Sequence, residues 1–154
     1  MILSRRHHGF TLIELLVAVA ILAIVAAVAM PIYSTYSDRS YRSEAQADLL
    51  LCAQGMERWA GTNFDYLGAA DTNGDGVGDA NAGNPAAQVC DPRSVDAGRY
   101  TLTVAATATT FTLRATPIAQ MAGDGFMTID QAGARAWDKN NNGSIGAGED
   151  DWSE

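Results

Sequence analysis

Histidine and cysteine are both scarce in this sequence. The two histidines, His7 and His8, fall within the first nine residues, and the two cysteines, Cys52 and Cys90, form no CxxC pair. Without histidine, the rest of the chain can build neither a Ser/His/Asp nor a Cys/His arrangement for nucleophilic catalysis. The sequence therefore predicts no enzyme activity. In an exported protein the cysteines would form one disulfide, and in a cytosolic protein they would be free thiols.

Positive charge is also scarce. The chain carries 10 Lys and Arg against 18 Asp and Glu, a net charge of −8. Arg5 and Arg6 form the one early positive cluster, and removal of residues 1–9 would leave eight positive against eighteen negative charges, or about −10. This balance argues against a protein that grips nucleic acid through a general basic surface. It suits a head that faces an ionic extracellular medium.

One long apolar run determines the compartment. Residues Phe10–Met30 are all apolar or small except Thr11 and Glu14. A helix of this length spans roughly 30 Å, about one hydrocarbon core of a bilayer. An ordinary signal peptide is the alternative, with Arg5 and Arg6 as its basic region and residues 27–29 as a cleavage site. The run is longer than a usual signal-peptide core, and it places a carboxylate where lipid disfavours one.

The residues around Gly9 favour the membrane anchor. Residues 5–14 read Arg-Arg-His-His-Gly-Phe-Thr-Leu-Ile-Glu, directly before the apolar run. This stretch resembles the processing site of the type IV pilin and pseudopilin family. The resemblance implies that a prepilin peptidase cleaves between Gly9 and Phe10 and methylates the new amine of Phe10. The leader would be residues 1–9, the membrane and filament helix 10–30, and the head 31–154.

Glu14 and Pro31 are the expected assembly residues of this helix. A carboxylate is tolerated in an apolar environment when it is paired, and it is favoured near a helix N-terminus. The resemblance implies that Glu14 pairs with the α-ammonium of Phe10 on a neighbouring subunit and sets the axial register of the filament. The alternative is a carboxylate that snorkels to the membrane surface without a partner. Pro31 removes one helical hydrogen bond, so it either kinks or ends the helix.

Beyond Pro31 the pattern predicts an α+β head. Six residues at helical spacing predict an amphipathic helix to about residue 60; they are Ala45, Leu49, Cys52, Ala53, Met56 and Trp59. Residues 61–98 show no sustained period and are expected to form a long loop or turns. Alternation from Tyr100 to Val104 and from Phe111 to Ala115 predicts two strands, with further strands near 126–130 and 134–137. An antiparallel meander of about three or four strands on one helix results, which is similar to the ladle fold of pilins.

The two cysteines would join the helix of this exported head to the segment before its first clear strand. A Cys52–Cys90 disulfide closes a loop that stabilises the fold by roughly 3–4 kcal/mol in the chain-entropy model. Many pilins also carry a C-terminal disulfide loop. No cysteine follows Cys90, so that second link is not expected.

Residues 138–149 match a calcium-loop pattern. They read Asp-Lys-Asn-Asn-Asn-Gly-Ser-Ile-Gly-Ala-Gly-Glu, in agreement with D-x-[DN]-x-[DN]-G-x5-E. The predicted oxygen ligands are Asp138, Asn140, Asn142, Ser144 through its carbonyl, and Glu149. Two anionic ligands indicate weak binding, at about 10⁻⁴–10⁻³ M. An Asn-Gly turn on a solvated acidic tail is the alternative.

A second candidate calcium loop lies at residues 71–79. It offers oxygens from Asp71, Asn73, Asp75 and Asp79, and it resembles short calcium repeats of extracellular proteins. Position 12 of this loop is Ala82, so the bidentate carboxylate of the first loop is missing. Three aspartates in nine residues repel one another without a cation. The alternative is a flexible Gly/Asp turn.

The sequence therefore predicts a structural subunit, in particular a minor subunit, of a type IV pilus or fimbria that acts in twitching motility, cell adhesion or DNA uptake. Its expected partners are other pilin subunits, the prepilin peptidase and the inner-membrane assembly platform. The subunit would sit in the inner membrane with a cytoplasmic N-terminus and a periplasmic head, and would then join an extracellular filament. A pseudopilin of a type II secretion system is the closest alternative. A secreted calcium-binding protein with an ordinary signal peptide is the alternative from another class.

Overall fold

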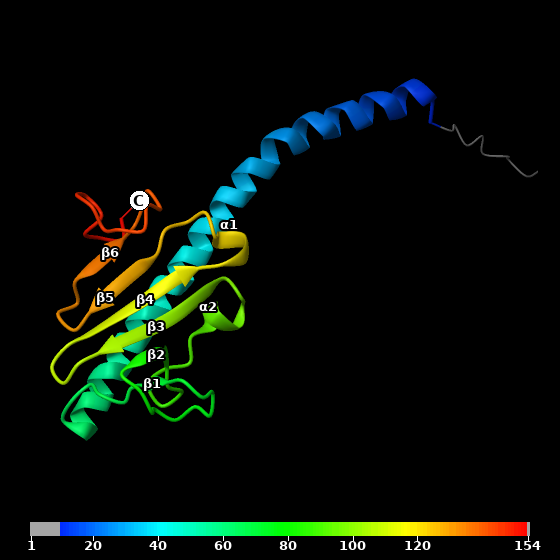
Figure 1. Ribbon diagram of the computed structural model, residues 1–154. Helices are drawn as coiled ribbons and strands as arrows, with labels where there is room; N and C mark the ends of the chain where they lie inside the picture. The colour runs from blue at the N-terminus through cyan, green and yellow to red at the C-terminus, as the bar shows by residue number, and fades with distance from the viewer. Residues whose placement is uncertain (1–9, 154) are drawn as a thin grey trace, which may run out of the picture. The chain divides into compact units, whose positions relative to one another are not determined.

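The computed structural model describes residues 10–153, which form two compact units that meet between Arg39 and Ser40. One helix, α1 (Leu12–Asn63), supplies the first unit and the first element of the second. The second unit also contains six strands, one further short α-helix and a 3₁₀ turn (Figure 1). Gly9 and the rest of the predicted leader lie outside the described residues.

The part of α1 in the first unit has an apolar surface all round. The large apolar side chains from Phe10 to Met30 are more than half exposed. Helix α1 is the one helix among the described residues that is long and apolar enough to cross a membrane. Pro31 lies inside α1 and does not end it, so of the two expected outcomes the end of the helix is wrong. The hydroxyl groups of Ser34 and Thr35 both donate to the carbonyl oxygen of Pro31, at 3.0 Å.

In the second unit, α1 buries the face that its spacing predicts. Its buried residues are Ala45, Asp48, Leu49, Cys52, Gly55 and Met56. They belong to the same hydrophobic core as the inward side chains of the sheet. The helix extends to Asn63, three residues beyond the predicted end near residue 60, a difference that is usual where the last turn frays.

The sheet is an antiparallel meander in which sequence order and spatial order agree. Its strands are β1 (Ala70–Asp71), β2 (Ala82–Pro85), β3 (Tyr100–Ala106), β4 (Phe111–Pro117), β5 (Met127–Asp130) and β6 (Arg135–Trp137). The central pair is in register from Tyr100 opposite Pro117 to Ala106 opposite Phe111. The alternation predicted for these two strands is confirmed, because their inward residues are buried.

The strand count is a correction to the sequence-based prediction. Six strands are present, not three or four, and the two unpredicted strands lie in the region expected to be loop. Strand β1 has two residues, and β2 has four that include a glycine and a proline. Strands this short carry no alternation that could be recognised in the sequence. They form through backbone pairing at the edge of the sheet, where β2 pairs with β3 and β1 pairs with β2.

The predicted disulfide is confirmed and holds a distinct segment against α1. Cys52 and Cys90 are bonded across 38 residues of sequence. The bonded segment, residues 89–99, includes α2 (Arg93–Asp96) and leads into β3. A Cβ atom at Gly55, one turn beyond Cys52, would lie 2.0 Å from the carbonyl oxygen of Val89. The close approach of this segment therefore requires a glycine in the middle of α1.

Candidate functional site

The predicted assembly residues lie at the start of α1. The side chain of Phe10 is 86% exposed, and Glu14 lies in the first turn. The backbone N–H and the hydroxyl of Thr11 both approach Oε2 of Glu14 at 3.4 Å, and the N–H of Glu14 donates to Oγ1 of Thr11 at 3.3 Å. This reciprocal arrangement is a capping box, which satisfies backbone groups at a helix start. The signal for this cap is the Thr-x-x-Glu spacing at residues 11–14 of the sequence.

The capping box gives Glu14 a role within its own chain. The same carboxylate is also predicted to pair with a neighbouring subunit, and the two roles are separable because Thr11 takes part only in the first. The structure contains no second subunit, so the intersubunit pair stays a prediction. The helix beyond Glu14 supplies the exposed apolar surface that such packing needs.

The C-terminal loop folds both of its end carboxylates against its own backbone. Asp138 is fully buried and accepts the N–H groups of Asn142 at 3.0 Å and Gly143 at 2.8 Å. Glu149 is 4% exposed and accepts the N–H groups of Asn140 at 3.2 Å and Gly146 at 2.7 Å. The structure thus brings together the first and last residues of the predicted calcium loop.

The donor set of this loop is made of oxygen atoms, which suits calcium. The side-chain oxygen of Asn140 accepts the N–H of Asn142, and that of Asn142 accepts the N–H of Ser144, so both amides lie folded along the loop. Within residues 10–153, no three His, Cys, Asp or Glu side chains converge as they would in a strong metal cluster. Calcium binding by this loop therefore stays a prediction.

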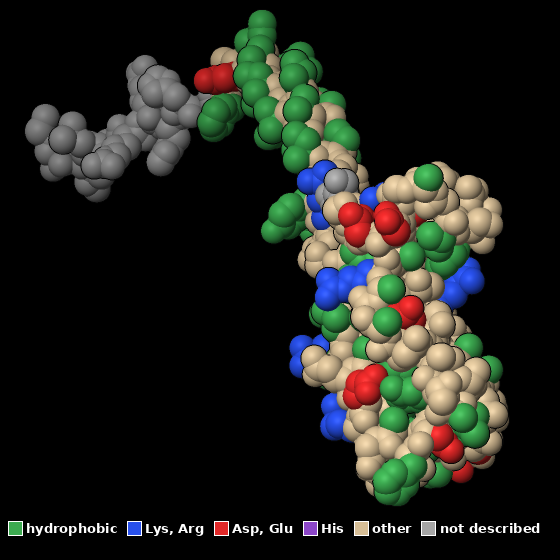
Figure 2. All heavy atoms as spheres, turned by 90° about the vertical axis from the view of Figure 1, so that its left-hand side faces the viewer, with side chains coloured by type: hydrophobic (Ala, Val, Ile, Leu, Met, Phe, Trp, Pro, Cys, Tyr) green, Lys and Arg blue, Asp and Glu red, His purple; other side chains and the backbone are tan. Residues whose placement is uncertain are grey.

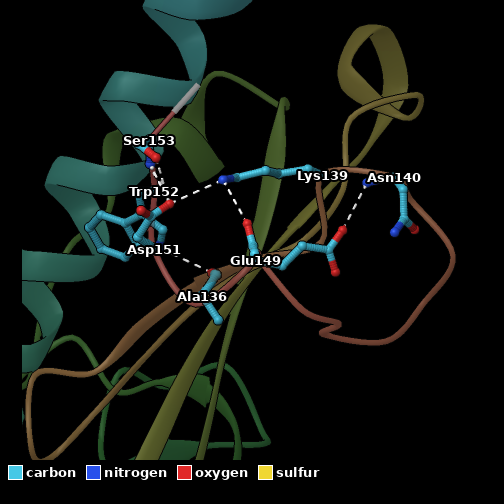
Figure 3. Close-up of polar contacts among 8 residues, drawn as sticks. Ala136, Lys139, Asn140, Glu149, Asp151, Trp152 and Ser153 are labelled. Atoms are coloured by element: carbon cyan, nitrogen blue, oxygen red, sulfur yellow. Dashed lines mark hydrogen bonds and ion pairs between the residues drawn. The ribbon is translucent and has the colours of Figure 1, made fainter.

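A tail that follows this loop is attached to the sheet by contacts that the sequence did not predict. The ammonium group of Lys139 donates to the carbonyl oxygen of Gly148 at 3.0 Å and to the carboxylate of Asp151 at 3.1 Å. Figure 3 shows Lys139 and Asp151 pointing toward one another. The indole N–H of Trp152 donates to the carbonyl of Ala136 in β6 at 3.1 Å. The Ser153 hydroxyl and the Lys139 ammonium lower the pKa of Asp151. These contacts attach the tail to β6 and to the 138–149 loop.

The first acidic loop has a different geometry. Asp71 accepts the N–H groups of Gly74 at 2.7 Å and Gly76 at 2.8 Å, which lowers the pKa of its carboxyl group. Asp79 accepts both the N–H and the hydroxyl of Thr72.

The side-chain oxygens of the remaining two predicted ligands in this loop also accept backbone groups. Asn73 accepts the N–H of Asp75, and Asp75 accepts that of Val77. Each predicted ligand is therefore held by local turn contacts, and the three aspartates do not form a joint cluster.

An arginine edge runs along α1 on the side of the 89–99 segment. Arg58 donates to the carbonyl of Val89 at 3.3 Å, and Ser94 donates its N–H to Asp48 at 2.6 Å. Arg99 forms an ion pair with Glu44 at 2.8 Å. Residues later in the segment contact residues earlier in α1. The segment and α1 therefore run antiparallel, over roughly 20 Å.

We define the arginine edge as Arg58, Arg93 and Arg99. Arg58 and Arg93 are exposed, Arg99 is half-buried, and the carboxylate of Asp48 beneath them is buried. The face of the head that Figure 2 shows carries separate Lys and Arg side chains as well as acidic ones, and not one broad basic patch. No local sequence pattern indicates the edge, because its residues are brought together by the disulfide-linked segment.

Comparison with known families identifies the family of this chain. A family described as "Type IV minor pilin ComP, DNA uptake sequence receptor" matches residues 31–128, more than half of the 154-residue chain. The chain belongs to this family. The prokaryotic N-terminal methylation motif matches residues 4–30 of this minor pilin. The predicted pilin-like α+β fold and the predicted role as a type IV pilus subunit are therefore confirmed.

Known relatives of this minor pilin are themselves pilins and fimbrial proteins. A fimbrial protein of Moraxella nonliquefaciens is 40% identical over 75 residues, 46% of each chain. The type IV major pilin protein PilE1 of Neisseria gonorrhoeae is 47% identical over 51 residues, 33% of this chain and 28% of the relative. The type IV major pilin protein PilA of Myxococcus xanthus is 50% identical over 44 residues, 29% and 20%. The matches cover less than half of each relative, and these relatives are structural proteins and not enzymes.

Proposed function

We propose that this minor pilin serves DNA uptake and that its arginine edge contacts the phosphate backbone of DNA. The observation that carries this proposal is the position of Arg58, Arg93 and Arg99 within the segment that matches the DNA uptake receptor family. Arginine forks bind phosphate oxygens well, and a line of them can follow one strand. Family membership indicates that the ligand is DNA, and the arginine edge is the surface that we propose for its contact.

This proposal agrees with the low positive charge of the chain. Three arginines can neutralise about three phosphates, which corresponds to a salt dependence no steeper than about −3 in log affinity against log salt concentration. Such binding is local and weak compared with that of a protein with a broad basic surface. The net charge of −8 then keeps other faces of the subunit away from DNA.

A test compares two variants that each remove two positive charges. Arg58→Gln with Arg93→Gln should reduce the salt slope of duplex binding by about 2 and reduce DNase-protected DNA uptake, because two phosphate contacts are lost. Arg114→Gln with Arg135→Gln removes the same charge from the sheet and should leave both quantities unchanged. The number of pili per cell should be normal in both strains. Equal effects of the two variants would show that net charge, and not the edge, determines binding.

We further propose that the subunit is made as a precursor with the topology that its sequence predicts. Cleavage after Gly9 leaves Phe10 at the mature N-terminus, where it is methylated by the prepilin peptidase. Arg5 and Arg6 precede the apolar helix, which supports a cytoplasmic N-terminus and a periplasmic head. The match of residues 4–30 to the methylation motif supports the same scheme. Its partners would then be the assembly platform and the other pilin subunits of the filament.

Calcium bound in the 138–149 loop is a proposal of its own. The buried carboxylates of Asp138 and Glu149 would hold the ion together with the oxygens of Asn140, Asn142 and Ser144. Bound calcium would supply the positive charge that these carboxylates lack as side-chain partners and would fix the tail. The loop at residues 71–79 would bind a second ion more weakly, because its aspartates are already held apart.

The expected result is a calcium-dependent melting temperature. A head fragment that lacks residues 1–33 should gain about 2.7 kcal/mol at a calcium concentration one hundred times the dissociation constant. This gain should raise the melting temperature by several degrees. Asp138→Ala with Glu149→Ala should remove most of the gain, and Asp71→Ala with Asp75→Ala should remove the rest. If the melting temperature is the same in chelator and in millimolar calcium, both loops are plain turns.

A further inference from the structure

Phe64 stands out as an aromatic residue in two unfavourable situations at once. It follows the last residue of α1, and its N–H donates to the carbonyl of Ala60 at 2.8 Å. Its φ of 65° lies in the left-handed region, where helix ends normally place glycine. Its side chain is 93% exposed, so the ring contributes almost nothing to the core of the head. Both features oppose folding, which points to a use for the ring outside the fold.

A pocket beside this helix end has the lining of a recognition site. Its volume is about 370 Å³, at the lower end of the range for small-ligand sites. It is lined by Arg58, Trp59, Thr62, Asn63 and Gln88. The indole of Trp59 is fixed in place because its N–H donates to the carbonyl of Leu67 at 3.0 Å. The pocket thus combines an aromatic ring, a guanidinium group and two amide side chains.

This pocket continues the arginine edge, because Arg58 belongs to both. The edge runs along α1, and the helix ends five residues beyond Arg58, where Phe64 projects. A strand whose phosphates follow the edge would therefore bring its bases to the pocket. An unpaired base offers a flat π-face for an aromatic ring and polar edges for amide and guanidinium groups.

We propose that Phe64 and the adjoining pocket bind an unpaired nucleobase, at a strand end or in single-stranded DNA. This inference rests on the proposed function in DNA uptake. A duplex, with two charged strands, fits this end of the head less well than a single strand, because Glu57 and Asp65 lie close to Phe64 in sequence and add negative charge there. Stacking needs few phosphates, so it suits an acidic head.

The test uses the detergent-solubilised full chain and two fluorescent probes, a single-stranded oligonucleotide of about 15 nucleotides and a duplex of the same sequence closed by hairpins at both ends. Phe64→Ala should weaken single-strand binding about tenfold, which is within the range for loss of one stacked base. It should change binding of the closed duplex by less than twofold. Phe64→Trp should keep wild-type affinity for both probes, because the aromatic face is retained.

Phe64→Gly separates a functional role from a structural one. Glycine relieves the left-handed backbone and removes the exposed ring, so the melting temperature should rise while single-strand affinity falls as in Phe64→Ala. Val77→Ser, which changes another exposed apolar side chain of the head, should have no effect on binding.

Two results would overturn the inference, and only the second of them would also overturn the proposed function. If the wild type binds the closed duplex through Arg58 and Arg93 but Phe64→Ala and Phe64→Gly bind the single strand normally, the base site is wrong and the proposed function stands. If the wild type binds neither probe, both are wrong.

Discussion

Replacement of both Cys52 and Cys90 by alanine is expected to lower the free energy of unfolding of the head by about 4 kcal/mol, since the disulfide closes a loop of 38 residues. Most small domains are stable by only about 5–15 kcal/mol, so this is a large fraction of the total. The loss should also loosen the 89–99 segment on α1, where the packing of Val89, the Arg99–Glu44 ion pair, the stacking of Arg99 on Tyr41 and two hydrogen bonds remain. Urea unfolding followed by circular dichroism measures the change.

A reducing agent provides the internal control for this experiment. Dithiothreitol should lower the unfolding midpoint of the wild type to that of the alanine variant and should leave the variant itself unchanged. DNA binding by the arginine edge should fall together with stability, because Arg93 and Arg99 lie on the loosened segment. Identical midpoints for the oxidised wild type and the variant would contradict the proposed contribution of the disulfide.

The helix and the long strands of this fold could be predicted from the sequence, and the shortest strands could not. The buried face of α1 repeats over three turns, and β3 and β4 each alternate over five residues, so their patterns can be recognised in the sequence. Strands β1 and β2 are too short for any pattern. They are defined by pairing partners that lie far along the chain, such as Val104 opposite Gly83.

The functional residues divide in the same way. The assembly role of Glu14 could be proposed from the sequence because it depends on neighbours in sequence, namely Gly9 and the apolar run. The arginine edge depends on two segments that only the folded chain brings together. The positive φ of Phe64 and the exposure of its side chain are known only from the folded structure, because no local sequence pattern indicates either of them.

Glu14→Gln is expected to abolish most incorporation of this subunit into pili. Glutamine keeps an oxygen that can accept from Thr11, so the capping box survives, but the negative charge is lost. In the filament the α-ammonium of Phe10 on the neighbouring subunit would then be uncompensated in an apolar environment. Removal of one partner of a buried ion pair costs about 3 kcal/mol or more, which corresponds to roughly a 100-fold loss of incorporation. Quantitative immunoblotting of sheared pili, with an epitope-tagged subunit, measures this quantity.

Thr11→Ala is the matched control, because it removes the cap and keeps the carboxylate. A lost cap costs about 1 kcal/mol, so incorporation should remain within a few-fold of the wild type. Intact-mass analysis should show that both variants begin at methylated Phe10, which establishes that processing after Gly9 is unaffected and that any defect arises in assembly. If Thr11→Ala reduces incorporation as strongly as Glu14→Gln, the carboxylate acts through the helix start of its own chain. The intersubunit pair would then be wrong, and the register of the filament would have to come from the apolar packing of α1 alone.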